Sequence, residues 1–560
     1  MKDWGTRIND AVAKSVVGRR FRLEGSGHRR ERKGSRFLTE VRAGLTTFFA
    51  MTYIISVNAT ILTDSGGPCV CHDTKDPTCK TDIDYNLCLN VLKRDQITAT
   101  AAISALSSFC MGLFSNMPIA LAPGMGLNAY FTYTVVGFHG SGPVSYGLAL
   151  TAVFVEGFIF VFLSIFGMRQ WLARAMPKCI KLASGVGLTY SAGIGAITGD
   201  KDTPVTLGGC VPSEMINGVC PGGAKMRNPT LWVGIFCGGI LTCILMMYRV
   251  KGAIIAGILL VSIISWPRPT NVTYFPHTVQ GNDAFEFFKK VVTFHKIEST
   301  LVQQEWNLAK AGGQFGLALI TFLYVDILDA TGTMYSMARF CGAIDERTQD
   351  FEGSAMAYTV DALSISIGSL LGTSPVTAFV ESGAGISEGG KTGLTAMTTG
   401  ICFFISLFFA PIFASIPPWA TGCTLILVGS MMVRVAADIN WRYMGDAIPA
   451  FVCLAVMPFT YSIAYGLIAG IISYAVLNSV VALVEVLSGG RVVPENKEFK
   501  DPWSYKVPGG VLPGWTRRLI KGMKDFWRED DESEHGLGQD DVVEAKVHPI
   551  SESHGFDKQS

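Results

Sequence analysis

Charged side chains are scarce in this sequence. They make up 16% of the 560 residues, whereas 49% of the residues are hydrophobic. About a quarter of the residues are charged in a typical soluble protein, which needs that charge to cover its surface. The charge that is present lies at both ends of the chain and in a few loops, with long apolar stretches between. This pattern excludes an ordinary soluble protein and predicts an all-α polytopic membrane protein whose partner is the lipid bilayer.

Other features are also missing. The 46 basic and 45 acidic residues nearly cancel, and the basic residues form no stripe with interleaved aromatics, so we expect no nucleic acid partner. The sequence contains no metal-ligand cluster, phosphate-binding loop or nucleophile motif. We therefore expect no catalytic residues, no metal site and no cofactor, and the protein is predicted not to be an enzyme.

Apolar stretches near the ~20 residues that a bilayer requires define the predicted membrane domain, residues 44–487. The third and tenth stretches are short and rich in Gly and Pro. The fourteen predicted spans are approximately 44–62, 97–117, 119–138, 146–168, 180–199, 230–248, 252–267, 314–337, 354–372, 374–390, 393–415, 420–436, 446–463 and 465–487.

The distribution of basic residues predicts the orientation of the chain. Residues 1–43 contain twelve basic and five acidic side chains, which places this N-terminal segment in the cytoplasm. An even number of spans returns the polar C-terminal tail, residues 488–560, to the same side. The outer side then receives the Asn271-Val-Thr sequon and the loop cysteines Cys69, Cys71, Cys79, Cys88, Cys210 and Cys220. The pairing of these cysteines stays open.

A repeat relates the two interrupted spans. Residues 118–128 and 375–385 both begin with proline, continue with a few extended-type residues and reach a Gly-rich turn beside a polar side chain. They lie seven spans apart. Because seven is odd, the two halves run in opposite directions across the membrane, as an inverted repeat. Gly/Pro-interrupted segments at matching positions of two halves indicate the binding site of a transporter.

Polar side chains in and beside these segments are the candidate site residues. Asp326 and Asp329 are three residues apart and share one helix face, and Thr333 lies one turn further on. Glu381 follows the extended part of the tenth span, and Asn128 lies in the third. Ionisable residues inside a membrane are functional candidates by default.

The remaining polar and aromatic residues of the spans favour plainer interpretations. Glu156 and Asp361 also lie within apolar spans, and a structural role is the better interpretation for both. Phe379, Tyr130 and Phe131 could stack on a planar ligand, although core packing is the commoner role for each aromatic alone. We keep Phe379 among the substrate-binding candidates.

Three stretches of the sequence are distinctive: residues 122–131 (APGMGLNAYF), 326–333 (DILDATGT) and 372–386 (GTSPVTAFVESGAGI). All three resemble the AzgA-like purine permeases of the nucleobase–ascorbate and xanthine/uracil permease superfamily. The resemblance extends from about residue 36 to about residue 487.

The resemblance implies a uracil-permease-like fold of fourteen spans in a seven-plus-seven inverted repeat. Spans one to four and eight to eleven would form a core domain, and spans five to seven and twelve to fourteen a gate domain. By motif position, Asp326 and Glu381 match the principal substrate-binding acids of the family, Asn128 matches its polar residue in span three, and Gly126 and Asp329 match secondary positions. It further implies a homodimer, and proton-coupled uptake of adenine, guanine and hypoxanthine across the plasma membrane, with H⁺ as coupling ion.

The alternative of the same fold is an anion transporter of the sulfate type. Against it, acidic site residues would repel an anion. A channel or a non-transporting receptor is a further alternative, which accumulation of substrate against its gradient would exclude.

Overall fold

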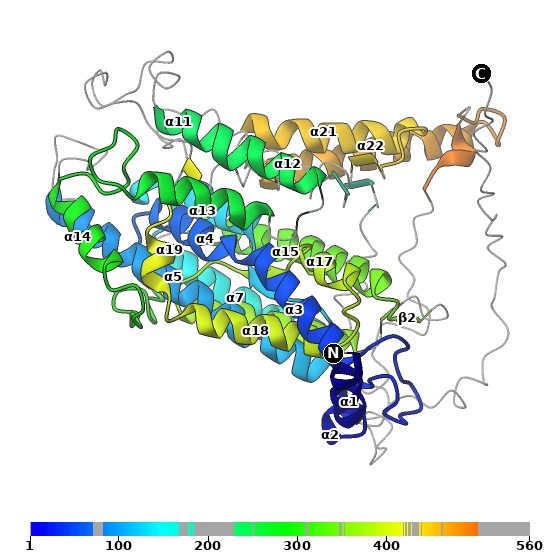
Figure 1. The fold of residues 1–560 in the computed structure, drawn as a ribbon. Coiled ribbons are helices and arrows are strands. Elements are labelled where there is room, and N and C mark those ends of the chain that lie inside the picture. The colour runs from blue at the N-terminus through cyan, green and yellow to red at the C-terminus, as the bar shows by residue number, and fades with distance from the viewer. Residues whose placement is uncertain are drawn as a thin grey trace, which may run out of the picture. The chain divides into compact units, whose positions relative to one another are not determined.

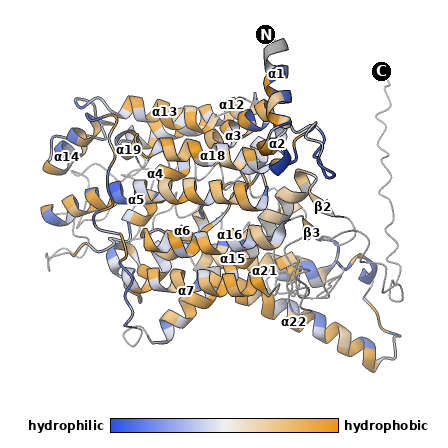
Figure 2. Cartoon of the chain, turned by 90° about the horizontal axis from the view of Figure 1, so that it is seen from below, coloured by the Kyte–Doolittle hydropathy of each residue, from blue (hydrophilic) through white to orange (hydrophobic). Residues whose placement is uncertain are grey.

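The protein is a mostly helical molecule in the computed structural model (Figure 1). The structure describes residues 2–501 except for 71–81, 167–176, 178, 181, 184–228, 249, 251–252, 308–311, 346–349, 352, 418, 421–422, 424–426, 428–435, 438, 461–462 and 495. Within this part, six helical stretches are long and apolar enough to cross a membrane, and three shorter apolar helices accompany them. Figure 2 shows that hydrophobic residues cover most of these helices, whereas the loop beside α2 is hydrophilic.

Long helices from both halves of the chain pack together around the candidate site. Helices α4 (Tyr53–Thr63) and α5 (Ile83–Cys110) lie side by side, and α18 (Gly393–Ser406) packs against both α3 (Phe37–Met51) and α5. Helix α7 (Tyr146–Ile165) packs against α15 (Gly313–Phe340) and α16 (Ser354–Leu370). These contacts bury the side chains of two large hydrophobic clusters, one around α7, α15 and α16 and one around α3, α5 and α18.

Two short segments interrupt this helical packing. Strand β1 (Leu121–Pro123) is followed by helix α6 (Met125–Ala129) and the π-helical η2 (Tyr130–Val136). Strand β4 (Val376–Ala378) is followed by helix α17 (Ser382–Ser387). Proline favours this local structure, because the residue before a proline is biased toward extended backbone and a proline has no N–H for a helical hydrogen bond.

The remaining described elements complete the chain. A second two-stranded sheet joins β2 and β3. The other elements are α11 (Pro229–Val233), η5 (Gly234–Ile240), α12 (Leu241–Met247), α13 (Ala253–Ser265), α14 (Val279–Phe288), β2 (Ile344–Asp345), β3 (Asp350–Phe351), α19 (Ala410–Ala414), α21 (Met444–Thr460), α22 (Ile463–Leu487), the π-helical η1 (Met111–Ser115) and the 3-10 turns η3 (Phe138–Gly140) and η8 (Lys497–Phe499).

Several helices depart from the ranges that hydropathy predicts. The first begins at Phe37 rather than near residue 44, and the second at Ile83 rather than near 97. Both extensions contain charged residues among apolar ones, which lowers their hydropathy below that of a span. The eleventh predicted span divides into α18 and α19 after Ser406. Most of the predicted fifth and twelfth spans, and the tail beyond residue 501, lie outside the described residues.

The basic N-terminal segment is folded against the membrane helices. It forms α1 (Lys2–Ala13) and α2 (Val16–Phe21), and Ala13, Phe21 and Leu23 pack with Leu394 of α18. The next residues reinforce this contact, since the Arg32 side chain donates a hydrogen bond to the carbonyl of Asn116 at 2.9 Å.

Glu40 stabilises the start of α18. Its buried carboxylate accepts hydrogen bonds from the backbone N–H groups of Lys391 at 3.1 Å and Thr392 at 3.0 Å, and from the Thr395 hydroxyl at 2.6 Å. These bonds satisfy amides that a helix N-terminus leaves without partners inside the helix.

A disulfide joins Cys69 to Cys88. Cys88 lies on helix α5 rather than in the loop where the sequence places it. Cys71, Cys79, Cys210 and Cys220 lie outside the described residues.

Candidate functional site

The two interrupted segments meet as a pair of antiparallel strands. Leu121 is the partner of Ala378, Ala122 of Thr377 and Pro123 of Val376. Further backbone hydrogen bonds extend the pairing at both ends, from Gly124 N to the Pro375 carbonyl at 3.0 Å and from Phe379 N to the Ala120 carbonyl at 3.1 Å. Because the strands are antiparallel, the helices that follow them leave the pair in opposite directions.

Small side chains make this pairing possible inside a membrane. A Cβ atom on Gly124 would lie 2.6 Å from the Thr377 methyl group, so the two segments approach more closely than another residue would allow. The free side of β1 is satisfied by Ser108, whose hydroxyl bonds to both the N–H and the carbonyl of Leu121 at 3.0 Å. Non-helical backbone is tolerated at membrane depth only where such partners exist.

Asn128 lies fully buried on α6, one turn after the strand. Its side-chain oxygen accepts a hydrogen bond from the Ser374 hydroxyl, which comes from the segment before β4. Among the described residues, its side-chain nitrogen has no hydrogen-bond partner. A buried amide in this state keeps two donors for a ligand.

Glu381 is the N-cap residue that immediately precedes helix α17. Its carboxylate accepts a hydrogen bond of 2.7 Å from the hydroxyl of Tyr53, the first residue of α4. Tyr53 is 2% exposed and packs with Val57 and Ile254 of α13 in a cluster between α4 and α13. One tyrosine thus joins a candidate site acid to the cluster that contains α13.

Asp326, Asp329 and Thr333 all lie on α15, as their spacing predicts. Asp326 and Thr333 are buried, and Asp329 is half-buried. The Thr377 hydroxyl donates a hydrogen bond of 3.5 Å to Asp329, which places α15 against strand β4. Asp361 of α16 is also an electrostatic neighbour of Asp329.

Asp329 is therefore the residue that links the acids of the site. Glu381, which precedes α17, is a second electrostatic neighbour of Asp329.

The aromatic candidates are packed into the protein. Phe131 is fully buried and Tyr130 is 5% exposed, and both rings contact Phe322 of α15, with ring centroids 6.2 and 5.1 Å away. This agrees with core packing as the commoner role. Phe379 is 5% exposed and belongs to a hydrophobic cluster that includes Ala120.

Gly126 lies half-buried on α6, where its carbonyl accepts a hydrogen bond from the Tyr130 N–H at the end of the helix.

Sequence reasoning missed several polar residues of this region. Tyr53 and Ser374 have no charge, so nothing in a hydropathy pattern distinguishes them from packing residues. Asn58 donates hydrogen bonds to the hydroxyls of Thr100 at 2.6 Å and Thr373 at 3.0 Å, which fixes the segment before β4. Asp361 carried a detectable signal, an acid in an apolar span, but its partner on another helix was not deducible.

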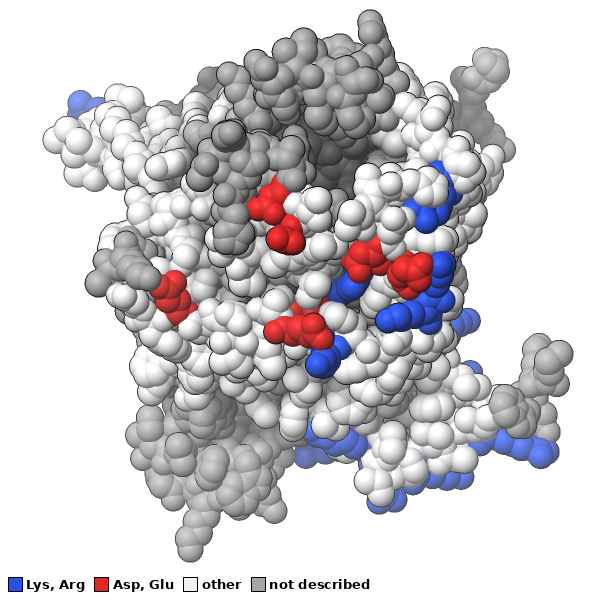
Figure 3. All heavy atoms as spheres, turned by 90° about the vertical axis from the view of Figure 1, so that its left-hand side faces the viewer, with Lys and Arg blue, Asp and Glu red and all other residues white. Residues whose placement is uncertain are grey.

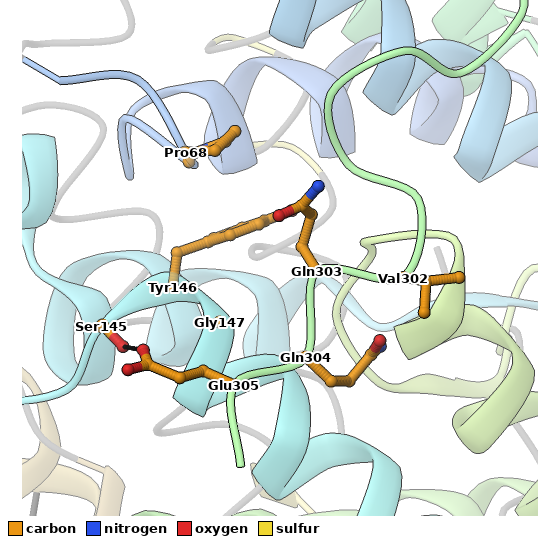
Figure 4. A pocket seen from close by; sticks show the side chains of 9 residues that line it. Pro68, Ser145, Tyr146, Gly147, Val302, Gln303, Gln304 and Glu305 are labelled. Atoms are coloured by element: carbon orange, nitrogen blue, oxygen red, sulfur yellow. Dashed lines mark hydrogen bonds between the residues drawn. The ribbon is translucent and has the colours of Figure 1, made fainter. Parts of the chain in front are cut away.

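A cavity of about 390 Å³ lies elsewhere, beyond the end of α4 (Figure 4). Figure 4 shows the Ser145 hydroxyl pointing to the Glu305 carboxylate, a hydrogen bond of 2.8 Å across one wall of this cavity. None of the candidate site residues lines it. Its lining consists of Gly67, Pro68, Ser145, Tyr146, Gly147, Val302, Gln303, Gln304 and Glu305.

The apolar helices and the paired strands carrying buried polar side chains define a membrane transporter. The same fold is found in the transmembrane domain of a cyanobacterial bicarbonate transporter, BicA, with a TM-score of 0.52, 13% identity, and coverage of 77% of this chain and 97% of that one. Neighbours of this type have the seven-plus-seven inverted repeat, which supports the predicted class of fold.

The chain belongs to the permease family of the xanthine/uracil permeases, whose model matches residues 86–469. The resemblance found in the sequence is thereby confirmed. The efflux pump notK' of Aspergillus versicolor is 65% identical over 95% of this chain and 94% of its own length. A putative xanthine/uracil permease of Schizosaccharomyces pombe is 60% identical, over 95% and 86%. The guanine/hypoxanthine permease PbuO of Bacillus subtilis is 32% identical, over 79% and 91%.

Proposed function

We propose that this permease is a proton-coupled symporter that carries the purine nucleobases adenine, guanine and hypoxanthine into the cell across the plasma membrane. The observation that carries the proposal is that Asp329 and Asn128 both bond to the segment around β4, at Thr377 and Ser374, while Glu381 follows the same strand in the chain. The printed names of PbuO and of the adenine permease AdeP of Escherichia coli support the substrate class.

The chemistry of a purine fits the proposed substrate-binding residues Asp326, Glu381, Asn128, Gly126 and Phe379. A purine is flat, neutral and edged with N–H donors and with nitrogen or oxygen acceptors. A buried carboxylate accepts from adjacent N–H groups, in bonds roughly twice as strong as those between neutral groups. The Asn128 amide donates to the acceptors. A base without the matching groups leaves these buried atoms unpaired and is rejected.

The same acids provide the coupling to H⁺, with Asp329 and Thr333 in a secondary role. Burial in general favours the neutral form of a carboxylic acid. A proton bound there removes the cost of moving a charge past the membrane barrier. One proton moving through 100 mV releases about 2.3 kcal/mol, which supports roughly 40-fold accumulation of a neutral base.

In this proposal the core domain moves against the gate domain, and both termini lie in the cytoplasm. The cluster of Tyr53, Val57, Ile254, Ile258 and Ile416 lies where α4 of the core meets elements assigned to the gate. A homodimer is the proposed assembly.

Uptake of labelled hypoxanthine by cells expressing the full chain tests the site. Asp326→Asn and Glu381→Gln remove one charge each with little change of volume, and each is expected to lower uptake at least about tenfold while the amount at the cell surface is maintained. Glu388→Gln is the matched control. Glu388 follows the last residue of α17 and pairs with the exposed Arg42 of α3, away from the strand pair. Uptake at the wild-type level in both site variants would reject the proposed site.

Two alternatives have observations in their favour. The fold neighbour BicA is named as a bicarbonate transporter, which favours an anion substrate, although a site of acids opposes it. Sulfate or bicarbonate that competes with hypoxanthine would support that alternative. The name of the relative notK' favours export instead of import. Cells preloaded with labelled hypoxanthine distinguish the two directions, because an exporter empties them against the gradient.

A further inference from the structure

Asp64 forms a polar contact with the third predicted span, residues 119–138 (the third segment below), away from the candidate site. It is the C-cap residue that immediately follows α4, at the end of the first span, and it is half-buried. Its carboxylate accepts a hydrogen bond of 2.8 Å from the hydroxyl of Tyr133 on η2. Because η2 continues directly from α6, this bond ties the far end of the helix that carries Asn128.

Tyr133 also connects this contact to the cluster between α4 and α13. Its ring packs against that cluster, as does Met125, the first residue of α6. The same side chains would therefore be disturbed by a motion of α13 against α4 and by a motion of the third segment. The Asp64–Tyr133 hydrogen bond fixes the third segment to the end of α4.

The groups that face Asp64 come from three elements. Tyr133 lies on η2, while Tyr85 and Lys93 on α5 are its electrostatic neighbours. The backbone N–H of His139, in the turn η3, donates a hydrogen bond of 2.9 Å to the Asp64 carbonyl, and the His139 ring contacts Tyr85. Burial raises the pKa of the Asp64 carboxyl to about 7, against the opposing effects of the Tyr133 hydroxyl and the Lys93 charge.

The end of the molecule where Asp64 lies is polar. Lys93 donates a hydrogen bond of 2.7 Å to Tyr274, and Arg94 pairs with Asp283 of α14 at 2.5 Å. Figure 3 shows acidic and basic side chains on the face where α14 lies. In the proposed orientation this is the outer end, so water on that side can supply protons to the region.

We propose that Asp64 is a positioning residue for transport: its ionised form holds the outer end of the third segment through Tyr133, and a proton taken up from outside loosens that hold. The physical reason is the strength of the bond. A hydroxyl bonded to a carboxylate is held roughly twice as strongly as one bonded to a neutral acid. The inference rests on the proposed function, since it assigns to external protons a second role beside their binding at the site acids.

Hydrogen exchange of the purified full chain tests whether the Asp64–Tyr133 hydrogen bond, called the latch below, responds to pH, and it does not require transport. A carboxyl that titrates near neutrality is about one-tenth protonated at pH 8 and about nine-tenths at pH 6. After correction for the intrinsic rates, exchange in residues 130–136 is expected to be faster at pH 6 than at pH 8 by up to about tenfold. Asp64→Asn and Tyr133→Phe are expected to exchange fast at both pH values.

Two controls share the chemistry without the contact. Asp283→Asn removes an acid from the same end, and His277→Gln removes an exposed residue of a type that titrates in the same interval. Both are expected to keep the wild-type pH dependence. Exchange that is independent of pH in the wild type, or unchanged by Asp64→Asn, would overturn the latch.

Uptake of labelled hypoxanthine connects the latch to transport. In cells, the ratio of uptake at pH 6 to uptake at pH 8 is expected to be smaller in Asp64→Asn than in the wild type, because the variant is loosened at both pH values. An unchanged ratio would contradict a role in transport. If the wild type takes up no purine, the proposed function fails, while the exchange experiment still decides whether the contact responds to pH.

Discussion

Tyr53 shows at the scale of one residue how polar groups are accommodated in this membrane protein. Its ring lies among the apolar residues of the cluster between α4 and α13, while its hydroxyl reaches Glu381. Asn58, one turn beyond on α4, uses its amide in the same way toward two threonine hydroxyls. A polar atom deprived of water costs free energy unless a partner replaces the water, so such pairs restrict the positions that the segments can take.

The hydrogen bond from Tyr53 to Glu381 predicts the effect of Tyr53→Phe on substrate binding. The change removes one hydroxyl and keeps the ring, so the cluster stays packed while Glu381 loses its donor. A hydrogen bond to a charged group contributes about 1.5–3 kcal/mol, so the hypoxanthine concentration that gives half-maximal uptake is expected to rise about tenfold or more. Tyr248→Phe is the control, because Tyr248 is 80% exposed. Equal half-maximal concentrations in the two variants would show that Tyr53 does not position Glu381 for binding.

At the scale of elements, the pair β1–β4 joins segments that are more than 250 residues apart in the chain. Each strand is only three residues long, so the pairing depends on close approach rather than on a long ladder of hydrogen bonds. Gly124 provides the approach and Thr377 occupies the space that it leaves. The Thr377 hydroxyl meanwhile bonds to Asp329, so one residue joins the strand pair to α15.

This geometry predicts a rescue between two substitutions. Gly124→Ala places a Cβ atom 2.6 Å from the Thr377 methyl group, and overpacking of this kind costs about 1–3 kcal/mol. The variant is expected to unfold at a lower temperature and to transport less. Thr377→Ser removes the methyl group and keeps the hydroxyl, so the double variant is expected to recover. Gly316→Ala is the control, since nothing lies within 4 Å of a Cβ there. Additive losses in the double variant would contradict the steric explanation.

At the scale of the whole molecule, the loops at the two ends of the membrane helices differ in the polar groups that they carry. One end carries the Cys69–Cys88 disulfide and the Arg94–Asp283 ion pair. The other carries the basic N-terminal segment, docked on the start of α18. Disulfides persist in oxidising compartments, and cytoplasmic loops are enriched in basic residues. Both trends favour the same orientation, with the disulfide outside.

Thiol labelling of intact cells tests this orientation. Asn271→Cys and Lys33→Cys each add one thiol at an exposed position, on opposite predicted sides. A membrane-impermeant maleimide is expected to label Asn271→Cys in intact cells and Lys33→Cys only after permeabilisation, both measured above the wild-type background. The reverse pattern would invert the predicted topology.

The sequence alone was enough to predict the membrane class and the family, and it marked two Gly/Pro-interrupted segments for attention. These properties are local: hydropathy follows composition over a span, and a Gly/Pro interruption is visible in a few residues. The same reasoning singled out Asp326, Asp329, Glu381 and Asn128, because a polar group in an apolar stretch is conspicuous wherever the stretch folds.

Only the tertiary structure decided which groups meet. Tyr53 bonds to Glu381 across 328 positions of the chain, Asn128 meets Ser374, and Asp64 meets Tyr133. Neither hydropathy nor spacing contains this information, because such contacts arise from how distant helices pack, and uncharged partners leave no signal in composition. The register of β1 against β4 and the choice of Cys88 as the partner of Cys69 depend on the same long-range packing.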